Sequence, residues 1–359
     1  MRGAALCVTA SSTAAQEGSL RICSFSAQNY VREFLEGPLR ASFPNSAFFE
    51  AALDLDTAQL AGGYDAACLF VNDLASEPVI KRLAEGGVRF LAMRCAGFDK
   101  VDVAAAAEAG IRVARVPTYS PHSVAEHAVA MLLCLNRNLH HAYLRVREGD
   151  YSLSGLVGFE LRTKVVGIVG TGAIGLAACQ IFRGFGSRVL AYDIREDPAA
   201  VALGVEYVSK ERLLREVDIV SLHCPLLPST YHIIDAESIA TMKPGAIIVN
   251  VSRGGLVDTD AACNALESGQ LGGLACDVYE HEGSLFFKDW RTCQLKEGFK
   301  VWDRKFQLLK TFPNVLISPH SAFLTSEALA NIAATTVENL KVLQAFEAGL
   351  PTLNELKAM

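Results

Sequence analysis

The sequence predicts an α/β protein built from two doubly wound parallel sheets. Short segments that are apolar throughout alternate with segments of helix length along most of the chain, and such strands are typical of parallel sheets covered on both faces. A glycine-rich turn, Gly170 to Gly175, directly follows one of these segments. The length of 359 residues is sufficient for two domains.

The expected strands fall into two series, which predicts two sheets. In the first series the strands are 20–24, 67–71, 89–93 and 112–116, with a helix at 101–109. In the second series they are 165–169, 189–192, 219–223, 246–251, 273–278 and 315–318. Apolar residues between 176 and 182 predict a helix that packs on the first strand of the second series.

A helix is expected between the two series. Ser120-Pro121 and a capping box from Ser123 to Glu126 predict its start. Apolar residues then recur at helical spacing, namely Val124, Ala128, Met131, Leu132, Leu135 and Leu139. This pattern leaves two interpretations open, packing within the subunit core or a dimer seam. His127 on the same helix is expected to be structural.

Composition excludes several classes of protein. Apolar residues make up 51% and charged residues 20%, so the chain can form a core, and a net charge of −6 provides no basic field for nucleic acid or anionic lipid. Ten evenly spread cysteines without a Cys-x-x-Cys pair argue against a disulfide framework or a metal site and for a reducing compartment. We expect a soluble intracellular protein, in the cytoplasm or, if residues 1–20 are a transit remnant, in an organelle such as the chloroplast or mitochondrial matrix.

The uncharged run from Val165 to Phe182 has 18 residues, the lower limit for a membrane span. Four glycines and Gln180 lie within it, and a span would place them in hydrocarbon. A buried strand, a turn and a helix explain the run better, and no membrane partner is expected.

The turn Gly170-Thr-Gly-Ala-Ile-Gly175 has the order and context of a dinucleotide-binding site. Gly170 permits the tight turn, Gly172 lets backbone N–H groups approach a pyrophosphate, and Gly175 lets the helix pack close to the strand. Asp193 follows 18 residues later, at the end of the next strand. Its carboxylate would accept hydrogen bonds from ribose hydroxyls and repel a 2′-phosphate, which favours NAD over NADP. Arg195 slightly weakens that preference.

Three polar residues, Arg253, Glu282 and His320, come shortly after other expected strands. Taken singly, each has an ordinary interpretation as a salt-bridged arginine, a loop carboxylate or a core histidine. Ligands bind beyond the carboxyl ends of the strands in open parallel sheets. Because all three lie there, in the sheet that carries the glycine turn, they form a candidate site.

Five ordered motifs carry a family resemblance. They are Gly170-Thr-Gly-Ala-Ile-Gly, His223-Cys-Pro-Leu, Asn250-Val-Ser-Arg-Gly-Gly, Asp277-Val-Tyr-Glu-His-Glu and Ser318-Pro-His-Ser-Ala-Phe. From about residue 20 to its end, the chain resembles the NAD-dependent D-2-hydroxyacid dehydrogenases. Three further segments are similar to the fermentative D-lactate dehydrogenase branch, namely Arg94-Cys-Ala-Gly-Phe-Asp, Val116-Pro-Thr-Tyr-Ser-Pro and Leu285-Phe-Phe-Lys-Asp-Trp.

The resemblance implies an enzyme that reduces pyruvate with NADH. A flavodoxin-like substrate domain, 1–119 plus 325–359, would hold an inserted Rossmann domain, 120–324, with hydride transfer in the cleft between them. Arg253 would bind the substrate carboxylate, and His320 would give a proton to the keto oxygen. Glu282 would hydrogen-bond His320 and fix its tautomer.

Further contacts follow from the same resemblance. The cofactor would be lined by Ala173, Ile174, Cys224, Pro225, Thr230, Val251 and Ser252, with Asp277 near the nicotinamide. Backbone N–H groups of Ala96 and Gly97 would bind the substrate, and Tyr119 and Phe323 would close a small apolar pocket. A homodimer or homotetramer is expected. Cys95 stands where some relatives carry Asn, so the preferred substrate side chain is left open.

Several alternatives remain at this stage. The chain could instead be a glyoxylate/hydroxypyruvate reductase, an isocaproate-type dehydrogenase or another D-2-hydroxyacid dehydrogenase, or an NAD(H)-sensing corepressor. Cys95 and Cys224 could be inert or sensitive to thiol oxidants. The segment 283–306, which carries Trp290, Cys293, Phe299, Trp302 and Phe306, is several residues longer than usual. It could be an ordered surface excursion, a substrate lid or a partner contact.

Overall fold

The computed structural model describes residues 20–292, 302–346 and 355–356. The chain divides into two compact units, residues 1–119 with 329–359 (unit 1) and residues 120–328 (unit 2). Unit 2 ends at residue 328, four residues later than the boundary expected after residue 324. The interpretation of residues 1–19 as a transit remnant lies outside the described residues, as do Cys293 and Phe299.

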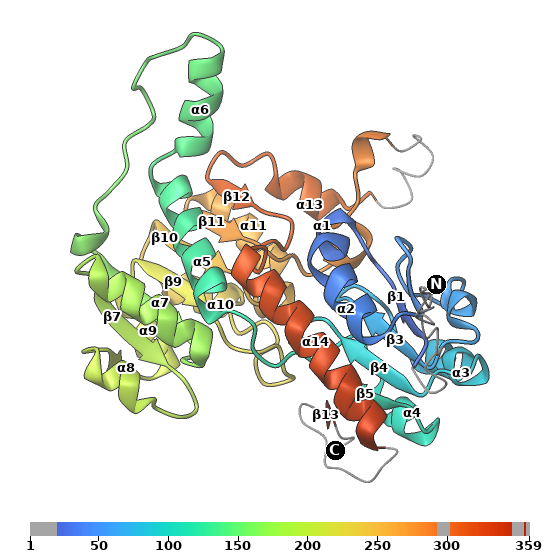
Figure 1. Cartoon of the computed structure of the whole chain (residues 1–359). Helices are drawn as coiled ribbons and strands as arrows, with labels where there is room; N and C mark the ends of the chain where they lie inside the picture. Colours follow the sequence, from blue (N-terminus) through green and yellow to red (C-terminus); the bar gives the residue numbers. More distant parts are fainter. Residues whose placement is uncertain (1–19, 293–301, 347–354, 357–359) are drawn as a thin grey trace, which may run out of the picture. The chain divides into compact units, whose positions relative to one another are not determined.

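The sheet of unit 1 has the flavodoxin-like strand order (Figure 1). Its described strands are β1 (Ile22–Ser24), β2 (Ser46–Phe48), β3 (Ala66–Leu69), β4 (Phe90–Met93), β5 (Arg112–Ala114) and β13 (Glu355–Leu356). The order is β13-β5-β4-β3-β1-β2, parallel from β5 to β2. The sequence did not predict β2, a three-residue edge strand, or β13, which is antiparallel to β5.

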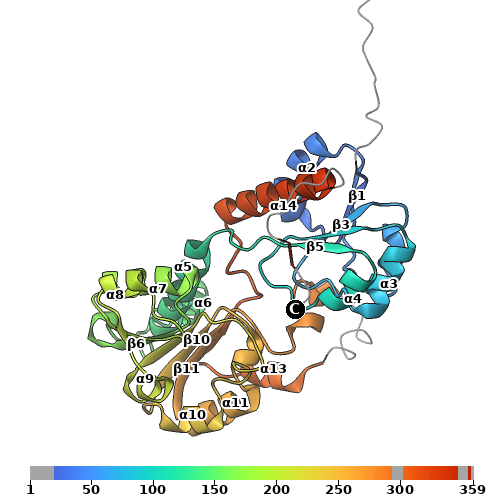
Figure 2. The ribbon, with the colours of Figure 1, turned by 90° about the horizontal axis from the view of Figure 1, so that it is seen from below.

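Helices cover both faces of this sheet, as a doubly wound fold requires. Figure 2 shows α2 and α14 on one face and α3 and α4 on the other. On the first face lie α1 (Asn29–Val31), the π-helical turn η1 (Arg32–Glu36), α2 (Gly37–Ser42) and α14 (Ser326–Phe346); the second face has η2 (Ala58–Ala61), α3 (Glu77–Glu85) and α4 (Val103–Glu108). Leu39 of α2 and Leu340 of α14 share one buried cluster, and Leu83 of α3 belongs to the other.

The sheet of unit 2 has the Rossmann order extended by one strand. Its strands are β6 (Val165–Val169), β7 (Arg188–Tyr192), β8 (Glu206–Tyr207), β9 (Ile219–Leu222), β10 (Ala246–Asn250), β11 (Leu271–Cys276) and β12 (Val315–Ile317). They are parallel in the order β12-β11-β10-β9-β6-β7-β8. Each strand predicted in either series is present, with ends within two residues of the expected ones. The short edge strand β8 was not predicted.

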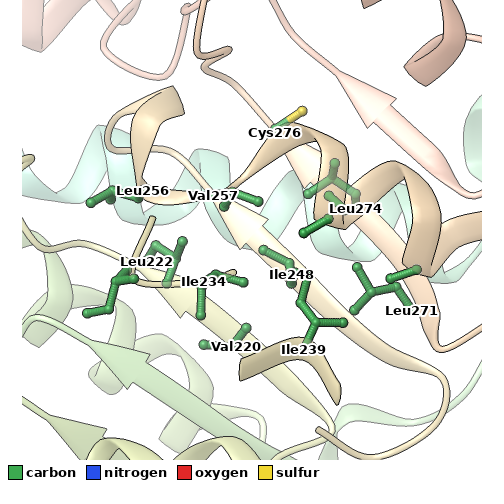
Figure 3. Close-up of a cluster of buried hydrophobic side chains, with 14 of the residues drawn as sticks. Val220, Leu222, Ile234, Ile239, Ile248, Leu256, Val257, Leu271, Leu274 and Cys276 are labelled. Atoms are coloured by element: carbon green, nitrogen blue, oxygen red, sulfur yellow. The ribbon is translucent and has the colours of Figure 1, made fainter. Parts of the chain in front are cut away.

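A large hydrophobic cluster lies between the sheet of unit 2 and the helices on one of its faces (Figure 3). These helices are α9 (Lys210–Glu216), α10 (Ala236–Thr241), α11 (Thr259–Ser268) and α13 (Arg304–Leu309). Leu222, Ile248 and Leu274, from three neighbouring strands, are buried in it with Ile239 of α10. The other helices are α5 (Pro121–Asn136) and α7 (Ala173–Gly184), which pack on each other, with α8 (Pro198–Ala202) next to α7, and α6 (Leu139–Arg147). Burial of strand side chains on this scale holds the strand ends, and the loops that follow them, in place.

Two predictions about the linking helix are wrong. Its N-cap is Ser120, whose Oγ accepts a hydrogen bond from the N–H of Ser123 at 3.3 Å; Ser123 therefore lies in the first turn, and the predicted capping box from Ser123 to Glu126 does not start the helix. The helix also ends at Asn136, because Asn138 adopts a left-handed conformation with φ of 50°. Leu139 begins the separate helix α6 and is exposed.

The apolar face of α5 packs within unit 2. Its side chains are buried against α7 and strands of the Rossmann sheet, and they are Val124, Ala128, Met131, Leu132 and Leu135. Of the two interpretations left open by the sequence, the structure supports core packing for this face.

The uncharged run from Val165 to Phe182 is strand β6, a turn and most of α7. None of the helices in the described parts of the chain combines the length and apolar character needed to cross a bilayer.

Candidate active site

The glycine turn lies between β6 and α7, and its shape depends on two missing side chains. Gly170 has a φ of 90°, and a Cβ there would lie 2.5 Å from the backbone nitrogen of Cys224. A Cβ on Gly175 would lie 1.9 Å from the carbonyl oxygen of Gly170. A Cβ on Gly172, in contrast, would meet no atom within 4 Å. The open space at Gly172 and the N-terminus of α7, which begins with Ala173 and Ile174, fit a phosphate group.

Asp193, one residue beyond β7, lies over the glycine turn. Its Oδ2 accepts hydrogen bonds from the N–H of Thr171 at 2.6 Å and from the Thr171 hydroxyl at 3.2 Å. The Tyr207 hydroxyl donates to Thr171 Oγ1 at 2.8 Å, and the N–H of Arg195 donates to Asp193 Oδ1 at 3.3 Å. Thr171 and Tyr207 therefore orient the carboxylate, a role that the sequence did not reveal because Tyr207 belongs to the unpredicted strand β8.

The loops after β9 and β10 meet beside the glycine turn. Ser252 Oγ donates to the carbonyl of Cys224 at 2.7 Å, and Thr230 Oγ1 donates to the carbonyl of Pro225 at 2.7 Å. The structure thus brings together four of the residues expected to line the cofactor, and Val251, also expected there, is buried next to Ser252. Burial raises the pKa of the Cys224 thiol to about 11, so it stays protonated at neutral pH. A protonated, buried thiol supports inert packing at this position.

His320 and Glu282 form a close pair. His320 Nδ1 lies 2.6 Å from Glu282 Oε1, and the second oxygen of Glu282 accepts the N–H of Tyr279 at 2.9 Å. The pair is largely shielded, with 13% of the His320 side chain and 17% of the Glu282 side chain exposed. The ring of Phe287 lies 5.9 Å from the imidazole. A carboxylate on Nδ1 fixes the proton there and leaves Nε2 for chemistry.

The turn that carries His320 is held by the buried carboxylate of Asp277. Its oxygens accept hydrogen bonds from the Ser318 hydroxyl at 2.5 Å and from the N–H groups of Ser321 and Ala322 at 2.8 Å each. His127 Nε2 lies 3.4 Å from the same carboxylate. Burial alone would raise the pKa of Asp277, but the hydrogen bonds from His127, Ser318 and the turn outweigh it and hold that pKa below its usual value.

This clamp keeps His320 in a conformation that residues other than glycine rarely adopt. Its φ is 54°, and its N–H donates to the carbonyl of Asp277 at 2.7 Å. The family resemblance implies that Asp277 lies near the nicotinamide, which stays a prediction. The structure adds that both carboxylate oxygens already hold the turn 318–322, and that His127 has a structural role beside them.

Arg253 follows β10 and precedes the short helix η4 (Gly254–Leu256). The side chain of Asn250 fixes its backbone, because Oδ1 accepts the N–H of Ser252 at 3.1 Å and Nδ2 donates to the carbonyl of Arg253 at 2.8 Å. A Cβ on Gly254 would lie 2.1 Å from the carbonyl carbon of Tyr279. The loop that carries Arg253 therefore packs tightly on the segment that leads to Glu282.

The other expected substrate contacts divide between the units. In unit 1, Ala96 and Gly97 follow β4, where the Ala96 carbonyl accepts a hydrogen bond from Arg115 Nη1 at 2.7 Å and the Gly97 carbonyl accepts one from the Cys95 thiol at 3.2 Å. The carbonyl of Tyr119 accepts one from Asn331 Nδ2 at 2.7 Å. Phe323, in unit 2, is buried.

Comparison with known proteins identifies the family. Residues 129–322 match the model described as D-isomer specific 2-hydroxyacid dehydrogenase, NAD binding domain. The chain belongs to this family. It is 44% identical to D-lactate dehydrogenase of Escherichia coli over 90% of this chain and 97% of the relative.

Solved structures of family members are also similar over nearly the whole chain. A structure of the pyruvate reductase of Chlamydomonas reinhardtii is 55% identical, with a TM-score of 0.89, and the match covers 94% of this chain and 99% of that chain. D-lactate dehydrogenase with NAD⁺ from Lactobacillus jensenii is 30% identical, with a TM-score of 0.76, and the coverage is 94% and 99%. The predicted family, its NAD-binding domain and the α/β class are confirmed.

Described parts of the segment 283–306 are anchored in unit 2. After the short helix η5 (Glu282–Ser284), Leu285 and Phe286 join the large buried cluster. The indole of Trp290, at the start of η6 (Trp290–Thr292), donates to the carbonyl of Leu285 at 2.7 Å. At the other end Phe306 packs on the same cluster and Trp302 is exposed. These contacts anchor the described ends of the segment, and its role as an ordered excursion, a lid or a partner contact stays a prediction.

Proposed function

We propose that this chain is a D-lactate dehydrogenase that reduces pyruvate with NADH and, in the reverse direction, oxidises D-lactate. The observation that carries the proposal is the His320–Glu282 pair at 2.6 Å, in the unit that also holds the glycine turn and Arg253. Relatives named D-lactate dehydrogenase and pyruvate reductase, at 44% and 55% identity, support pyruvate as the substrate.

The glycine turn and Asp193 are the residues that would hold the cofactor. Backbone N–H groups at Gly172 and the start of α7 would bind the pyrophosphate, and Asp193 would accept hydrogen bonds from the adenosine ribose. When bound, NADH supplies the hydride that adds to C2 of the keto acid. Ala173, Ile174, Pro225, Thr230, Val251 and Ser252 would line the rest of this site, and their contacts stay predictions.

Arg253 would hold the substrate by its carboxylate. A guanidinium presents parallel N–H donors that match both oxygens of a carboxylate, which orients the neighbouring C2 carbonyl as well as binding it. Ala96, Gly97, Tyr119 and Phe323 are proposed as further substrate contacts.

His320 would act as the general acid. Because Glu282 accepts the Nδ1–H, the imidazolium would give its Nε2 proton to the keto oxygen as the hydride arrives at C2. Glu282 would stabilise the positive charge before transfer. In lactate oxidation, the neutral Nε2 would take the hydroxyl proton back.

A substrate panel tests the proposed function. Oxidation of NADH and NADPH is followed with pyruvate, phenylpyruvate, glyoxylate and hydroxypyruvate. We expect the highest kcat/KM with pyruvate and NADH. Faster turnover of glyoxylate or hydroxypyruvate would favour a reductase of those acids, and NADH binding without turnover of any keto acid would favour a corepressor.

Substitution of His320 tests the mechanism. His320→Gln keeps a polar side chain but cannot transfer a proton, so we expect kcat for pyruvate to fall by about 10²–10⁴-fold with NADH affinity largely retained. His122→Gln, at an exposed histidine of α5, is the control and should leave both constants unchanged. Turnover of His320→Gln within a few-fold of the wild type would contradict the assignment.

We also propose that α6 and residues 148–157 form the contact of a homo-oligomer. Figure 1 shows α6 projecting from the rest of unit 2, and no residue from Leu139 to Arg147 is buried. Seven apolar side chains of α6 and residues 148–157 are more than half exposed: Leu139, Tyr143, Leu144, Val146, Tyr151, Leu153 and Val157. A nine-residue helix is marginal without packing, and a concentrated apolar surface is typical of an interface.

Light scattering of Leu144→Arg tests this contact. A charge in an apolar interface should shift the protein towards the monomer, whereas Val201→Arg, at an exposed apolar position of α8, should not. A monomeric wild-type protein would refute the proposal.

For the compartment we propose a reducing intracellular environment. The eight cysteines among the described residues form no disulfide bonds with one another. Imaging of the tagged full-length chain would separate cytoplasm from organelle, and a secreted protein would contradict this proposal.

A further inference from the structure

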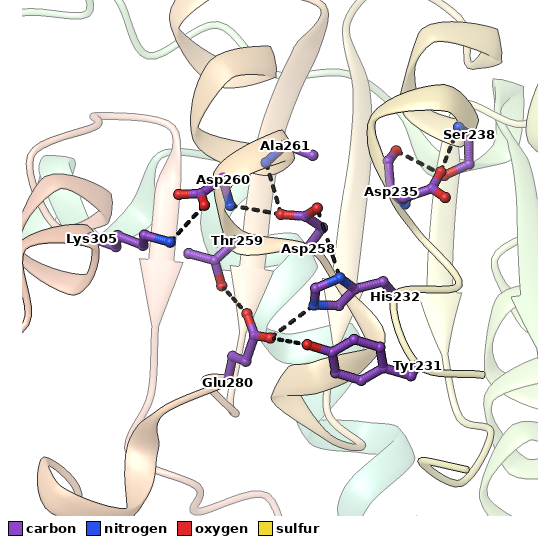
Figure 4. Close-up of polar contacts among 10 residues, drawn as sticks. All are labelled: Tyr231, His232, Asp235, Ser238, Asp258, Thr259, Asp260, Ala261, Glu280 and Lys305. Atoms are coloured by element: carbon purple, nitrogen blue, oxygen red, sulfur yellow. Dashed lines mark hydrogen bonds and ion pairs between the residues drawn. The ribbon is translucent and has the colours of Figure 1, made fainter. Parts of the chain in front are cut away.

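Glu280 is a third shielded carboxylate near the candidate site, after Glu282 and Asp277, and the proposed reaction does not use it. Its side chain is 13% exposed. Oε1 accepts hydrogen bonds from His232 Nε2 at 2.8 Å and from the Tyr231 hydroxyl at 3.0 Å, and Oε2 accepts one from the Thr259 hydroxyl at 3.0 Å (Figure 4). The carboxylate therefore joins the segment of Glu280 to two others in unit 2, so that three separate parts of the chain meet here.

Each of these parts carries a residue with a proposed role. His232 is two residues after Thr230, Thr259 follows the loop that carries Arg253, and Glu280 is two residues before Glu282. The side-chain hydrogen bonds of Glu280 thus form a junction of three segments. These segments lead to the cofactor loop with Thr230, to the loop of Arg253 and to Glu282, which pairs with His320.

Backbone contacts complete the same junction. The N–H of His232 donates to the carbonyl of Gly255 at 2.9 Å, and Ile234 and Val257 form a parallel bridge. Gly254 packs against the backbone of Tyr279 and Glu280 so closely that a Cβ would lie 2.2 Å from the Glu280 nitrogen. The loop of Arg253 is therefore held on one side by the segment 231–234 and on the other by Glu280.

Electrostatics keep Glu280 charged at this position. Burial would raise the pKa of Glu280, but the hydrogen bonds from His232, Thr259 and Tyr231 outweigh it and hold that pKa below its usual value. The bond to this carboxylate in turn raises the pKa of Tyr231. His232 lies between two carboxylates, since its Nδ1 is 3.7 Å from Asp258 Oδ2.

His232 adopts its position at a conformational cost. Its φ is 49°, a left-handed conformation that is unfavourable for a residue other than glycine. Its ring stacks on Tyr231 with 3.9 Å between the centroids. Contacts to Glu280 and Tyr231 over-determine this strained residue, as is common where strain serves function.

We propose that Glu280 and His232 form a positioning couple that fixes the Arg253 loop against the segment carrying Glu282. Neither residue touches the substrate; the couple acts through Arg253 and Glu282, and it rests on the proposed function. Removal of the couple lets the Arg253 loop shift, while the glycine turn, which is shaped by its own close backbone approaches at Gly170 and Gly175, keeps its conformation.

Kinetics of Glu280→Ala test the proposal. Because displacement of a positioning group by about 1 Å can cost on the order of 10²-fold, we expect kcat/KM for pyruvate to fall about 10–100-fold, with KM for pyruvate rising. NADH affinity, measured by fluorescence titration, should change by no more than about twofold, because the glycine turn that would bind the pyrophosphate is not one of the segments that Glu280 joins. Unchanged kcat/KM, or a loss confined to thermal stability, would overturn the proposal.

A neighbouring ion pair provides the matched control. Lys305 Nζ and Asp260 Oδ2 lie 2.6 Å apart and link α13 to α11 at the surface (Figure 4). Lys305→Met removes this pair without touching Glu280 or His232, so the kinetic constants should stay at wild-type values.

A double-mutant cycle distinguishes failure of this inference from failure of the proposed function. If Glu280 acts through Arg253, the loss caused by Glu280→Ala should largely disappear in an Arg253→Lys background, because residues that act together are non-additive. Arg253→Lys alone should raise KM for pyruvate; if it does not, the proposed function is wrong. If Arg253→Lys has its effect but Glu280→Ala has none, or the two effects add, only the positioning couple is refuted.

His232→Asn serves if Glu280→Ala does not fold. Asn tolerates a positive φ better than most residues, so the backbone is retained while the bond from Nε2 to Glu280 is lost. We expect a smaller loss in kcat/KM for pyruvate, about 3–10-fold, again through KM. Wild-type kinetics in a folded His232→Asn protein would also overturn the couple.

Discussion

The glycine turn after β6 and the His320 turn after β12 are both loops at carboxyl ends of strands in one parallel sheet, yet they are held in shape in opposite ways. At the glycine turn, side chains are missing where Gly170 and Gly175 approach other backbone atoms. At the His320 turn, a buried carboxylate, Asp277, accepts hydrogen bonds from residues 318–322. Each turn contains a residue with positive φ, Gly170 in the first and His320 in the second.

This difference follows from what each turn has to present. A phosphate is bound by backbone N–H groups, so the glycine turn needs open space and no side chain. A proton is transferred by a side chain, so the second turn must keep an imidazole in a conformation that glycine would adopt more readily. The strain at His320 is therefore balanced by charged hydrogen bonds, which are stronger than neutral ones. Substitutions should therefore disrupt the glycine turn by steric clash and the His320 turn by removing the charge of Asp277.

Loss of the Asp277 carboxylate should have the largest effect. Asp277→Ala leaves the N–H groups of Ser321 and Ala322 without their acceptor, at roughly 1–3 kcal/mol each. It also frees the turn that carries His320, so we expect kcat for pyruvate to fall by about 10²-fold. Urea unfolding and steady-state kinetics measure the two effects. A stable protein with normal kcat would show that the turn holds itself.

Added side chains at the glycine turn should act next in size. Gly175→Ala places a Cβ against a backbone oxygen that cannot move away, so we expect a loss of stability of roughly 1–3 kcal/mol and weaker NADH binding. Gly172→Ala meets no atom, so it should keep the stability of the wild type and weaken only NADH binding. Equal stability losses in the two variants would contradict the difference between these glycines.

Lowering the pH should distinguish the buried carboxylate of Asp277 from a surface carboxylate. We expect this effect on stability to be the smallest of the three. The pKa of Asp277 is lowered in the folded state, so its contribution to stability is present above the unfolded pKa of about 4 and is lost as pH falls from there through the lower pKa of the folded state. The stability difference between wild type and Asp277→Asn should therefore shrink between pH 5 and pH 3 (about one unit either side of that pKa). Asp289→Asn is the control. The pKa of Asp289 is lowered to about 2 by exposed Arg291, but solvent screens such a pair, so its stability difference from the wild type should stay small. A constant difference for Asp277→Asn would mean that its charge does not stabilise the turn.

Elements with a strong apolar pattern were predictable, and elements that depend on their neighbours were not. All ten predicted strands are present because buried parallel strands must be apolar throughout. The edge strands β2 and β8 were not predicted, because strands of only three and two residues with little burial show no apolar pattern. The break between α5 and α6 was missed because Leu139 continues the helical spacing, although Asn138 turns the chain.

The candidate site divides in the same way. Gly170, Asp193, Arg253, Glu282 and His320 could be named because each occupies a fixed place after an apolar strand. The clamp at Asp277 could not, because its partners in the His320 turn are 41–45 residues away in the chain. The contacts of Glu280 with His232 and Thr259 span 48 and 21 residues, and no local pattern records them.

The sequence by itself determined the class of fold, the order of the strands along the chain, the glycine turn and the identity of the residues proposed for chemistry. These depend on hydrophobic periodicity and on residue types that a turn or a reaction requires locally. Only the tertiary structure decided which buried carboxylate serves which loop: Glu282 pairs with His320, Asp277 holds its turn, and Glu280 ties the Arg253 loop to its surroundings. The physical reason is that a buried charge is stable only where donors converge on it, and that convergence exists only once distant segments have packed.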